Sequence, residues 1–435
     1  MLDIGFGIAP RAGHRPGIRD MFPGADWAAD FEEGAYFANG AALTLNAVVS
    51  DTRASPIILA DPEGWLTTLP AATPVRTGRG LHVYGPATPL VSASDEFSTW
   101  SLQNGATIIP NAALGADGAV SAARVTGASG QSSSALYTSL PSVTARRIKK
   151  VFRVKADTAD KLNFGLYQSG PGWFAQTSRI RSGPGVVSGT HLQLLTGLRT
   201  DAFTEVEVTL NDAQSGIVKI YIYPDGATVS DGKSILLDFV QATSWPAEPI
   251  INPDLQTSGT LMVREACRPH LVPGSGGTPF EGYDPSNPLL TFAVEWEGAP
   301  VATGVSKHLL YLQKAADHGM SRANRVALYL SEPSSSLTLA VYDEGGTFQG
   351  GANAGNGVND GGRHRALGLI DHSTRSLTLA VDGQPPVSLT AAAFASPFGV
   401  AGLGHDYLAQ SANHLNGVIT RAAFASGNRL ESWMG

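Results

Sequence analysis

The feature that most constrains the fold is an alternation of apolar and polar side chains between residues 363 and 389. At its centre, residues 376–381 read SLTLAV, and this period of two predicts a β-strand with one buried face. A similar strand pattern precedes it, and the polar residues 371–375 between the two predict a short hairpin loop. Asp382-Gly383 predicts a second tight turn, which leads into a third strand.

The composition agrees with a chain of many strands and turns. The 435 residues can form two or three domains, and a hydrophobic content of 43% is too high for a disordered chain. With 50 glycines, 27 prolines and only 15% charged residues, the chain is rich in residues that punctuate strands. Cys267 is the only cysteine, so no intrachain disulfide can form, and we expect this thiol to be buried and inert.

The charge and the hydropathy of the chain argue against two classes of partner, nucleic acids and membranes. The net charge is −7 and no long basic run occurs, which argues against a nucleic-acid partner. The one basic cluster, at residues 146–150, is expected to be a solvated strand edge. No apolar run reaches the roughly 18 residues of a membrane span, so no membrane insertion is expected. The N-terminus does not resemble a signal peptide, which predicts assembly in the cytoplasm.

The first 50 residues are rich in glycine and aromatic side chains and lack a clear period. One interpretation is a docking arm that becomes ordered on a partner, because a free segment of this kind would expose a large apolar area. The alternative is a segment folded against its own chain. The aromatic residues of the predicted arm are Phe22, Trp27, Phe31, Tyr36 and Phe37. Residues 51–91 are expected to form a short β connector after it.

A series of short elements follows the predicted arm. These elements are Arg53-Ala54-Ser55, Asp61 to Leu66, Pro74 to Arg76, Gly80 to Val83, Phe97, Trp100, Gly105 to Thr107, Asp117-Gly118 and Ala122 to Val125. In this order they resemble the opening of phage tail and virion-appendage proteins. Phe97 and Trp100 are expected to fill one end of a β-sandwich core.

Residues 92–283 are predicted to form a jelly roll that resembles carbohydrate-binding modules. Alternating strands are expected throughout, including a hairpin between residues 206–210 and 218–222. Trp173 and Phe174 lie in a glycine-rich segment and can stack on a sugar ring, since flat apolar rings match the CH faces of pyranoses. The alternative is that this pair folds back onto the core.

Residues 284–435 resemble laminin-G-like, concanavalin A-like lectin domains. The resemblance rests on the strands of residues 363–389 and on the closing elements from Val400 to Leu430. SLTLAV occurs at residue 336 and again at residue 376, which predicts two similar strands of one sandwich. The predicted fold is therefore all-β, with two jelly-roll β-sandwich domains in tandem after an N-terminal docking arm.

The polar stretch 343–362 is longer than a hairpin requires, and long loops on rigid scaffolds often carry binding sites. We expect it to form a sugar site at the rim of the lectin-like domain, or alternatively a flexible or subunit-contacting loop. The predicted carbohydrate-binding residues here are Asn353, Asn356, Asn359, Asp360, His405, Asp406 and Tyr407.

The resemblance also raises a calcium site, since laminin-G-like domains often hold Ca²⁺ on a rim loop. Asp343, Asp360 and Asp406 are the candidate ligands, with turn-forming carboxylates as the alternative. No other cofactor is expected. No catalytic motif is present, and Glu295 and Glu297 are interpreted as a solvated outer face rather than an acid–base pair.

Together these patterns resemble an appendage of a bacteriophage or gene transfer agent. The resemblance implies a trimeric fibre or spike that docks on other virion proteins through its N-terminal arm and binds capsule or lipopolysaccharide. A depolymerase of the same glycan and a purely structural decoration protein are the alternatives.

Overall fold

The computed structural model describes residues 17–53, 57–60, 66–85, 89–91, 96–226, 229–244, 267–271, 288–298, 306–314, 321–331, 336–355, 357–393, 398–406 and 413–434. Its regular structure is almost entirely β-strand, which confirms the predicted all-β fold class. The chain forms two compact units. Unit 1 comprises Met1–Ser55, Ala71–Pro86 and Glu265–Gly435, and unit 2 comprises Pro56–Pro70 and Ala87–Arg264. Unit 2 therefore interrupts unit 1 in the sequence.

Unit 1 is a sandwich of two antiparallel sheets. Sheet 1 runs β3 (Ala41–Leu43), β2 (Ala35–Ala38), β1 (Trp27–Asp30), β32 (Gly417–Ser426), β23 (Leu289–Gly298), β28 (Arg363–Asp371), β29 (Ser376–Val381) and β30 (Val387–Thr390), with β8 (Gly80–Val83) joined to β32 and β7 (Arg76–Thr77) to β8. Sheet 2 runs β27 (Phe348–Ala354), β26 (Ser336–Tyr342), β25 (Arg325–Ser331), β24 (Lys307–Gln313), β31 (Val400–Leu403), β22 (Pro269–Leu271) and β4 (Val49–Asp51). Large apolar side chains such as Phe292, Trp296 and Leu379 fill the space between them.

The hairpins predicted around residue 376 are confirmed. Strands β28 and β29 pair from Ala366↔Val381 to Asp371↔Ser376, and β29 then pairs with β30. The two SLTLAV segments are β26 and β29, which belong to opposite sheets of one sandwich, as predicted. The prediction of a single buried face is wrong for β28, because Leu367 packs outward into a second apolar cluster.

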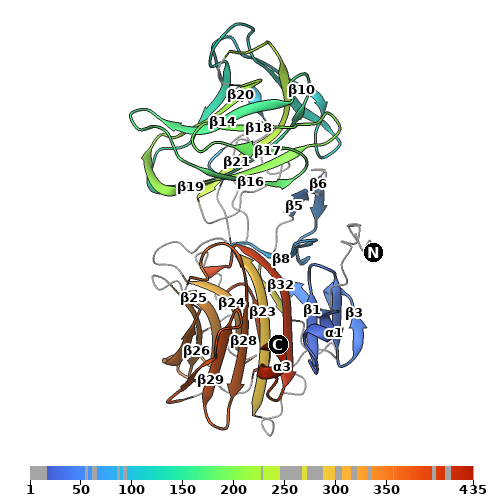
Figure 1. The fold of residues 1–435 in the computed structure, drawn as a ribbon, viewed down its shortest axis with the longest axis vertical. Helices are drawn as coiled ribbons and strands as arrows, with labels where there is room; N and C mark the ends of the chain where they lie inside the picture. The colour runs from blue at the N-terminus through green and yellow to red at the C-terminus, as the bar shows by residue number, and fades with distance from the viewer. Residues whose placement is uncertain are drawn as a thin grey trace. The chain divides into compact units, whose positions relative to one another are not determined.

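The N-terminal segment is not the free docking arm that was predicted, because it packs against its own chain in this second cluster. Strand β1 pairs with β32 in the register Trp27↔Phe424, and Figure 1 shows β1 beside the closing strand β32, with β3 farther out at the edge of the sheet. The predicted docking aromatics are all buried: Phe22, Trp27, Phe31, Tyr36 and Phe37. Helices α1 (Ile18–Met21) and α3 (Leu430–Met434) contribute to the same cluster, while α2 (Leu45–Val48) leads into β4. The boundaries at residues 50 and 91 are therefore wrong, because residues 17–53 and 71–85 belong to unit 1, whereas Leu90 and Val91 pack in the core of unit 2.

Unit 2 is a second two-sheet sandwich. Sheet 3 runs β10 (Thr107–Leu114), β11 (Val120–Thr126), β21 (Ser234–Ser244), β13 (Val143–Ala156), β19 (Thr204–Gly216) and β16 (Thr177–Ser182). Sheet 4 runs β17 (Val186–Ser188), β18 (Gln193–Thr196), β14 (Lys161–Gln168), β20 (Lys219–Pro224), β12 (Ala135–Ser139) and β9 (Ser101–Gln103), with β15 (Gly172–Trp173) on β14. The 3₁₀ helix η1 (Phe97–Thr99) precedes β9, and β5 (Ile57–Ala60) pairs with β6 (Leu66–Leu69) in a two-stranded sheet.

The core of unit 2 confirms one prediction and corrects two. Phe97 and Trp100 are buried with their ring centroids 5.5 Å apart, as expected. The predicted hairpin of residues 206–222 is wrong, because β19 lies in sheet 3 and β20 in sheet 4. The basic cluster is not a solvated edge either, since β13 lies inside sheet 3 with Lys149 and Lys150 buried. No helix in the described parts of the chain is long and apolar enough to cross a membrane.

Candidate functional site

Sheet 4 of unit 2 carries aromatic side chains on its outward side. In β20, Ile220 and Ile222 point into the core, so the alternate residues Tyr221 and Tyr223 lie on the opposite side of the sheet. Strand β12 brings Tyr137 directly opposite Tyr221. A strand that buries isoleucines on one side thus displays tyrosines on the other.

Trp173 reaches the same side of the sheet through a tight turn. Gly170 and Gly172 have φ angles of 101° and 90°, which only glycine adopts readily, and they turn β15 back along β14. Tyr167 and Trp173 then pair across these strands. Gly165 makes room for the indole, because a Cβ at this position would lie 2.9 Å from the Trp173 ring. The backbone therefore fixes the tryptophan over the sheet.

We call these five residues the aromatic face: Tyr137, Tyr167, Trp173, Tyr221 and Tyr223. The Trp173 ring lies 5.1 Å from Tyr167 and 5.4 Å from Tyr221, in edge-on geometry. Tyr221 stacks on Tyr137 at 5.0 Å and on Tyr223 at 5.8 Å. Tyr221 and Tyr223 are 7% and 4% exposed, whereas the other three residues are partly exposed. Two buried rings therefore support three that solvent can reach.

The phenols of the face are uncharged and suit hydrogen bonding to a hydroxyl-rich ligand. Burial, followed by the neighbouring tyrosines, raises the pKa of Tyr221 and of Tyr223. Their phenols therefore stay protonated at neutral pH and can donate hydrogen bonds as well as accept them. Partly exposed aromatic rings can also stack against the CH faces of a pyranose. The face can thus bind a sugar, but it holds no pair of groups that would act as acid and base.

The structure places the two residues of the predicted sugar-stacking pair, Trp173 and Phe174, on opposite sides of sheet 4. Trp173 lies on the aromatic face, as its predicted role requires. Phe174 is 9% exposed and belongs to the core of unit 2, so its assignment to sugar binding is wrong. Adjacent residues of a strand point to opposite sides of a sheet, which is why the two rings separate.

The predicted rim loop of unit 1 is only partly a loop. Residues 348–354 form β27, which pairs with β26. Asn353 is exposed on this strand, and its side-chain oxygen accepts a hydrogen bond from the Thr338 hydroxyl at 2.6 Å. Asn359 and Asp360 lie beyond the end of β27. Asn356 and Tyr407 fall outside the described residues.

Asp360 belongs to a small polar cluster around His364. The two ring nitrogens of His364 lie 2.8 Å from Asp382 Oδ2 and 2.8 Å from Asp360 Oδ1. Burial lowers the pKa of His364, but the two carboxylate hydrogen bonds outweigh it and leave the pKa above its usual 6.5. The ring also packs at 5.5 Å from Trp296, so it links the loop at Asp360 to the end of the sandwich core.

His405 and Asp406 do not line a rim site. They are 3% and 1% exposed. The His405 ring nitrogens contact the backbone oxygens of Asp406 and Pro269 at 2.8 and 3.0 Å. The Asp406 carboxylate accepts hydrogen bonds from Arg325 at 2.5 Å and Asn413 at 2.8 Å. Their assignment to sugar binding is therefore wrong, because both side chains are engaged in the interior.

The candidate calcium ligands are also kept apart by other contacts. Asp343 caps a turn by accepting the backbone N–H groups of Gly345 and Thr347, both at 2.9 Å. Asp360 is bound to His364, and Asp406 to Arg325. In the described part of the chain, no group of three or more His, Cys, Asp or Glu side chains is arranged to hold a metal ion. The turn-forming alternative therefore describes Asp343.

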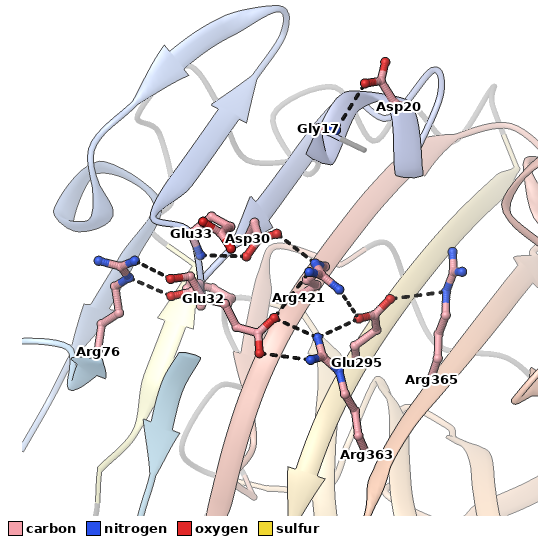
Figure 2. Close-up of polar contacts among 11 residues, drawn as sticks. Gly17, Asp20, Asp30, Glu32, Glu33, Arg76, Glu295, Arg363, Arg365 and Arg421 are labelled. Carbon is pink, nitrogen blue, oxygen red and sulfur yellow. Dashed lines mark hydrogen bonds and ion pairs between the residues drawn. The ribbon is translucent and has the colours of Figure 1, made fainter. Parts of the chain in front are cut away.

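A second polar feature, which we call the charged row, crosses sheet 1 of unit 1. Asp30, Arg421, Glu295 and Arg365 occupy one cross-strand register on β1, β32, β23 and β28, so their charges alternate. Arg421 lies 2.8 Å from both Asp30 Oδ2 and Glu295 Oε2 (Figure 2). Arg365 continues the row with a 3.6 Å contact to Glu295.

The charged row is better suited to holding strands together than to acid–base chemistry. Glu295 is 6% exposed, so its prediction as a solvated residue is wrong. A catalytic carboxylate pair needs one group kept protonated and one ionised. Here Arg421 and Arg363 both bind Glu295, and Arg363 also pairs with Glu32 through two contacts of 2.9 Å. The carboxylates of Glu295 and Glu32 are thus held by arginines rather than left open to a substrate.

The sequence interpretation missed the four tyrosines of the aromatic face, although a signal was present. Residues 218–222 were predicted to form an alternating strand, in which Ile220 and Ile222 occupy apolar positions. The same alternation places Tyr221 and Tyr223 on the other side, where two large aromatic residues on an outward surface indicate a contact. The contributions of Tyr137 and Tyr167 depend on strand pairing, which the sequence does not reveal.

The comparisons with known proteins identify only distant similarities. The sequence matches no protein-family model and no curated protein. Among solved structures, the chain is similar to the CBM40 domain of the Ruminococcus gnavus IT-sialidase, with 13% identity and a TM-score of 0.27 over 32% of this chain and 76% of that one. It is also similar to domains LG4-5 of the mouse laminin alpha1 chain, with 13% identity and a TM-score of 0.23 over 81% of this chain and 90% of that one. Values this low support no inference about ligand or activity.

Proposed function

We propose that this protein binds cell-surface polysaccharide through the aromatic face of unit 2. The observation that carries the proposal is Trp173, held partly exposed over Gly165 and supported by Tyr221. A ring fixed in this way loses little conformational entropy when a sugar stacks on it. The phenols around it can bond to sugar hydroxyls.

The biological setting that we infer is attachment of a phage-like particle to its host. The elements from Arg53 to Val125 resemble those of virion appendages, and the glycan would be capsule or lipopolysaccharide. One shallow face binds weakly, so trimerisation and several copies on a particle would supply avidity. Because the aromatics of the N-terminal segment are buried, docking on the particle would use another surface. In this proposal the protein binds its glycan without cleaving it.

The test is binding of the purified protein to host capsule and lipopolysaccharide, with released reducing ends measured in the same samples. Trp173→Ala should weaken binding roughly 5- to 10-fold, since stacking on an aromatic ring contributes about 1–1.5 kcal/mol. Phe348→Ala is the matched control, because it removes a 54% exposed aromatic ring from unit 1 and should change nothing.

Each outcome decides between the alternatives. Saturable binding that depends on Trp173, without cleavage, supports the proposal. Reducing ends that accumulate with time would replace it with a depolymerase. Absence of both binding and cleavage would overturn it and leave a structural role in the particle.

A further inference from the structure

The strands of sheet 4 have an unusual charge composition. Lys161 and Lys219 are the only charged residues within the described strands of this sheet, and none of these strands contains an aspartate or a glutamate. Sheet 3 of the same unit contains Glu205, Glu207 and Asp238. The whole chain carries a net charge of −7, so an outward face without carboxylates is a local departure from its average.

Lys219 is the charge closest to the aromatic face. It shares the outward side of β20 with Tyr221 and pairs in register with Tyr167 on β14. Its ammonium lies 5.0 Å from the centroid of the Tyr137 ring. It forms no ion pair with any carboxylate among the described residues, so the ring holds the charge in place without neutralising it.

Lys161 marks the other end of the same strand. It lies six residues from Tyr167 on the outward side of β14, which corresponds to about 20 Å along the strand. Asp160 precedes it, and Asp225 follows the strand that pairs beside it. Asp160 and Asp225 therefore lie at the Lys161 end, whereas Lys219 lies beside the rings.

We propose that the ligand of the aromatic face is a negatively charged saccharide, whose ring stacks on Trp173 while its anionic substituent pairs with Lys219. This inference rests on the proposed function and specifies the class of sugar. A lysine that is partly exposed and already oriented by Tyr137 can exchange water for a carboxylate or phosphate oxygen at little cost. The absence of acids from the strands removes the repulsion that such a ligand would otherwise meet.

Single-stranded nucleic acid also combines flat rings with anions. The observations favour a saccharide, because a nucleic-acid strand requires a basic groove along its backbone and this face offers one lysine beside its rings. An oligo-dT probe belongs in the test for this reason, and tighter binding of this probe than of every saccharide would overturn the inference.

The experiment compares uronate-containing capsular polysaccharides with the same polymers after their carboxylates are reduced to alcohols. Wild-type protein should bind the acidic form roughly 5- to 10-fold tighter. Lys219→Met should bind both forms equally, and Lys233→Met, which removes an exposed lysine outside sheet 4, should retain the preference. Raising NaCl from about 50 mM to about 0.5 M should weaken only the binding of the acidic form.

The outcomes separate the two proposals. Trp173→Ala should weaken binding to both forms by the same factor, whereas Lys219→Met should lose only the preference for the acidic form. Equal binding of acidic and reduced polymers by the wild-type protein would overturn the charged-sugar inference and leave glycan binding intact. Failure of the wild-type protein to bind either form would overturn the proposed function itself. Matching unfolding curves for all variants would show that the differences do not come from misfolding.

Discussion

Lys150 places an amine inside the core of unit 2. The residue is fully buried, and its Nζ lies 5.1 Å from the ring centroids of Phe152 and Phe164. The amine has no hydrogen-bond partner among the described residues. Desolvation lowers the pKa of Lys150 from 10.5 to about 7. The buried Lys150 amine therefore destabilises the folded state at a position where an apolar side chain would fit.

Lys150→Met should stabilise unit 2 by about 3 kcal/mol at pH 7, because it removes an uncompensated buried amine of similar length. Between pH 7 and 10.5 the unfolded chain binds a proton that the folded chain does not, so the free energy of unfolding of the wild type should rise with pH across this window. Chemical denaturation from pH 6 to 10 measures both effects. If the free energy of unfolding of the wild type depended on pH no more than that of the methionine variant, this account would be contradicted. Lys233→Met, which removes an exposed lysine, is the control.

His364 should have the opposite pH dependence. The pKa of His364 is raised in the folded state, so the ion pairs of this side chain contribute fully to the stability of unit 1 below pH 6.5. That contribution is lost as the pH rises through the higher folded pKa. His364→Gln should therefore destabilise unit 1 by about 1 kcal/mol at pH 5.5 and by almost nothing at pH 9. Denaturant unfolding at the two pH values measures the difference. A loss of equal size at both would show that packing against Trp296, rather than charge, accounts for it.

At the scale of elements, the charged row ties strand β1 to the rest of sheet 1. Arg421→Met should cost about 3 kcal/mol, because Asp30 and Glu295 would remain buried without their shared partner. Arg79→Met removes an arginine from a more exposed pair with Glu297 and should cost less than about 1 kcal/mol. Thermal unfolding of the two variants compares them directly. Equal losses of stability in the two variants would mean that burial does not strengthen the ion pairs of the charged row.

The elements also show which structure a sequence can reveal. The hairpin of β28 and β29 was predictable, because both strands and their four-residue loop are contiguous and the register follows from the loop. The step from β19 to β20 was not, since a short connection can close a hairpin or cross between two sheets with the same alternation. Only the partners β13 and β14, which come from elsewhere in the chain, distinguish the two cases.

The residues of the candidate site also fall into those that local sequence predicts and those that depend on distant partners. Trp173 was found from its glycine-rich surroundings, a local signal. Phe174 was assigned wrongly because one residue of register reverses the side of a strand. His405 and Asp406 were assigned to a rim because their surroundings are loop-rich, and their burial involves Arg325 and Pro269 from distant parts of the chain. Non-local partners therefore decide which polar residues are available to a ligand.

At the scale of the whole molecule, unit 2 is inserted into unit 1 as two segments, residues 56–70 and the much longer residues 87–264. The chain leaves unit 1 for the long segment after β8 and returns before β22, and the backbone N–H of Cys267 donates to the Tyr84 backbone oxygen at 2.8 Å. Gly85 is fixed nearby by a 2.7 Å hydrogen bond to the Asn416 side chain. Unit 1 thus brings the two ends of the insertion together with its own hydrogen bonds. Insertions of this kind are tolerated where the ends of a domain lie close together.

This arrangement predicts that unit 1 and the long segment of unit 2, residues 87–264, fold without each other. A shortened chain in which a few glycines and serines replace residues 87–264 should retain a cooperative unfolding transition and the β-sheet circular dichroism of unit 1, because the core of unit 1 draws no residue from that segment. Residues 87–264 expressed alone should bind the polysaccharide with the single-site affinity of the full chain, since the aromatic face lies entirely within them. Aggregation of either fragment under conditions in which the full chain is soluble would contradict independent folding. A folded but non-binding fragment would instead show that unit 1 contributes to the site.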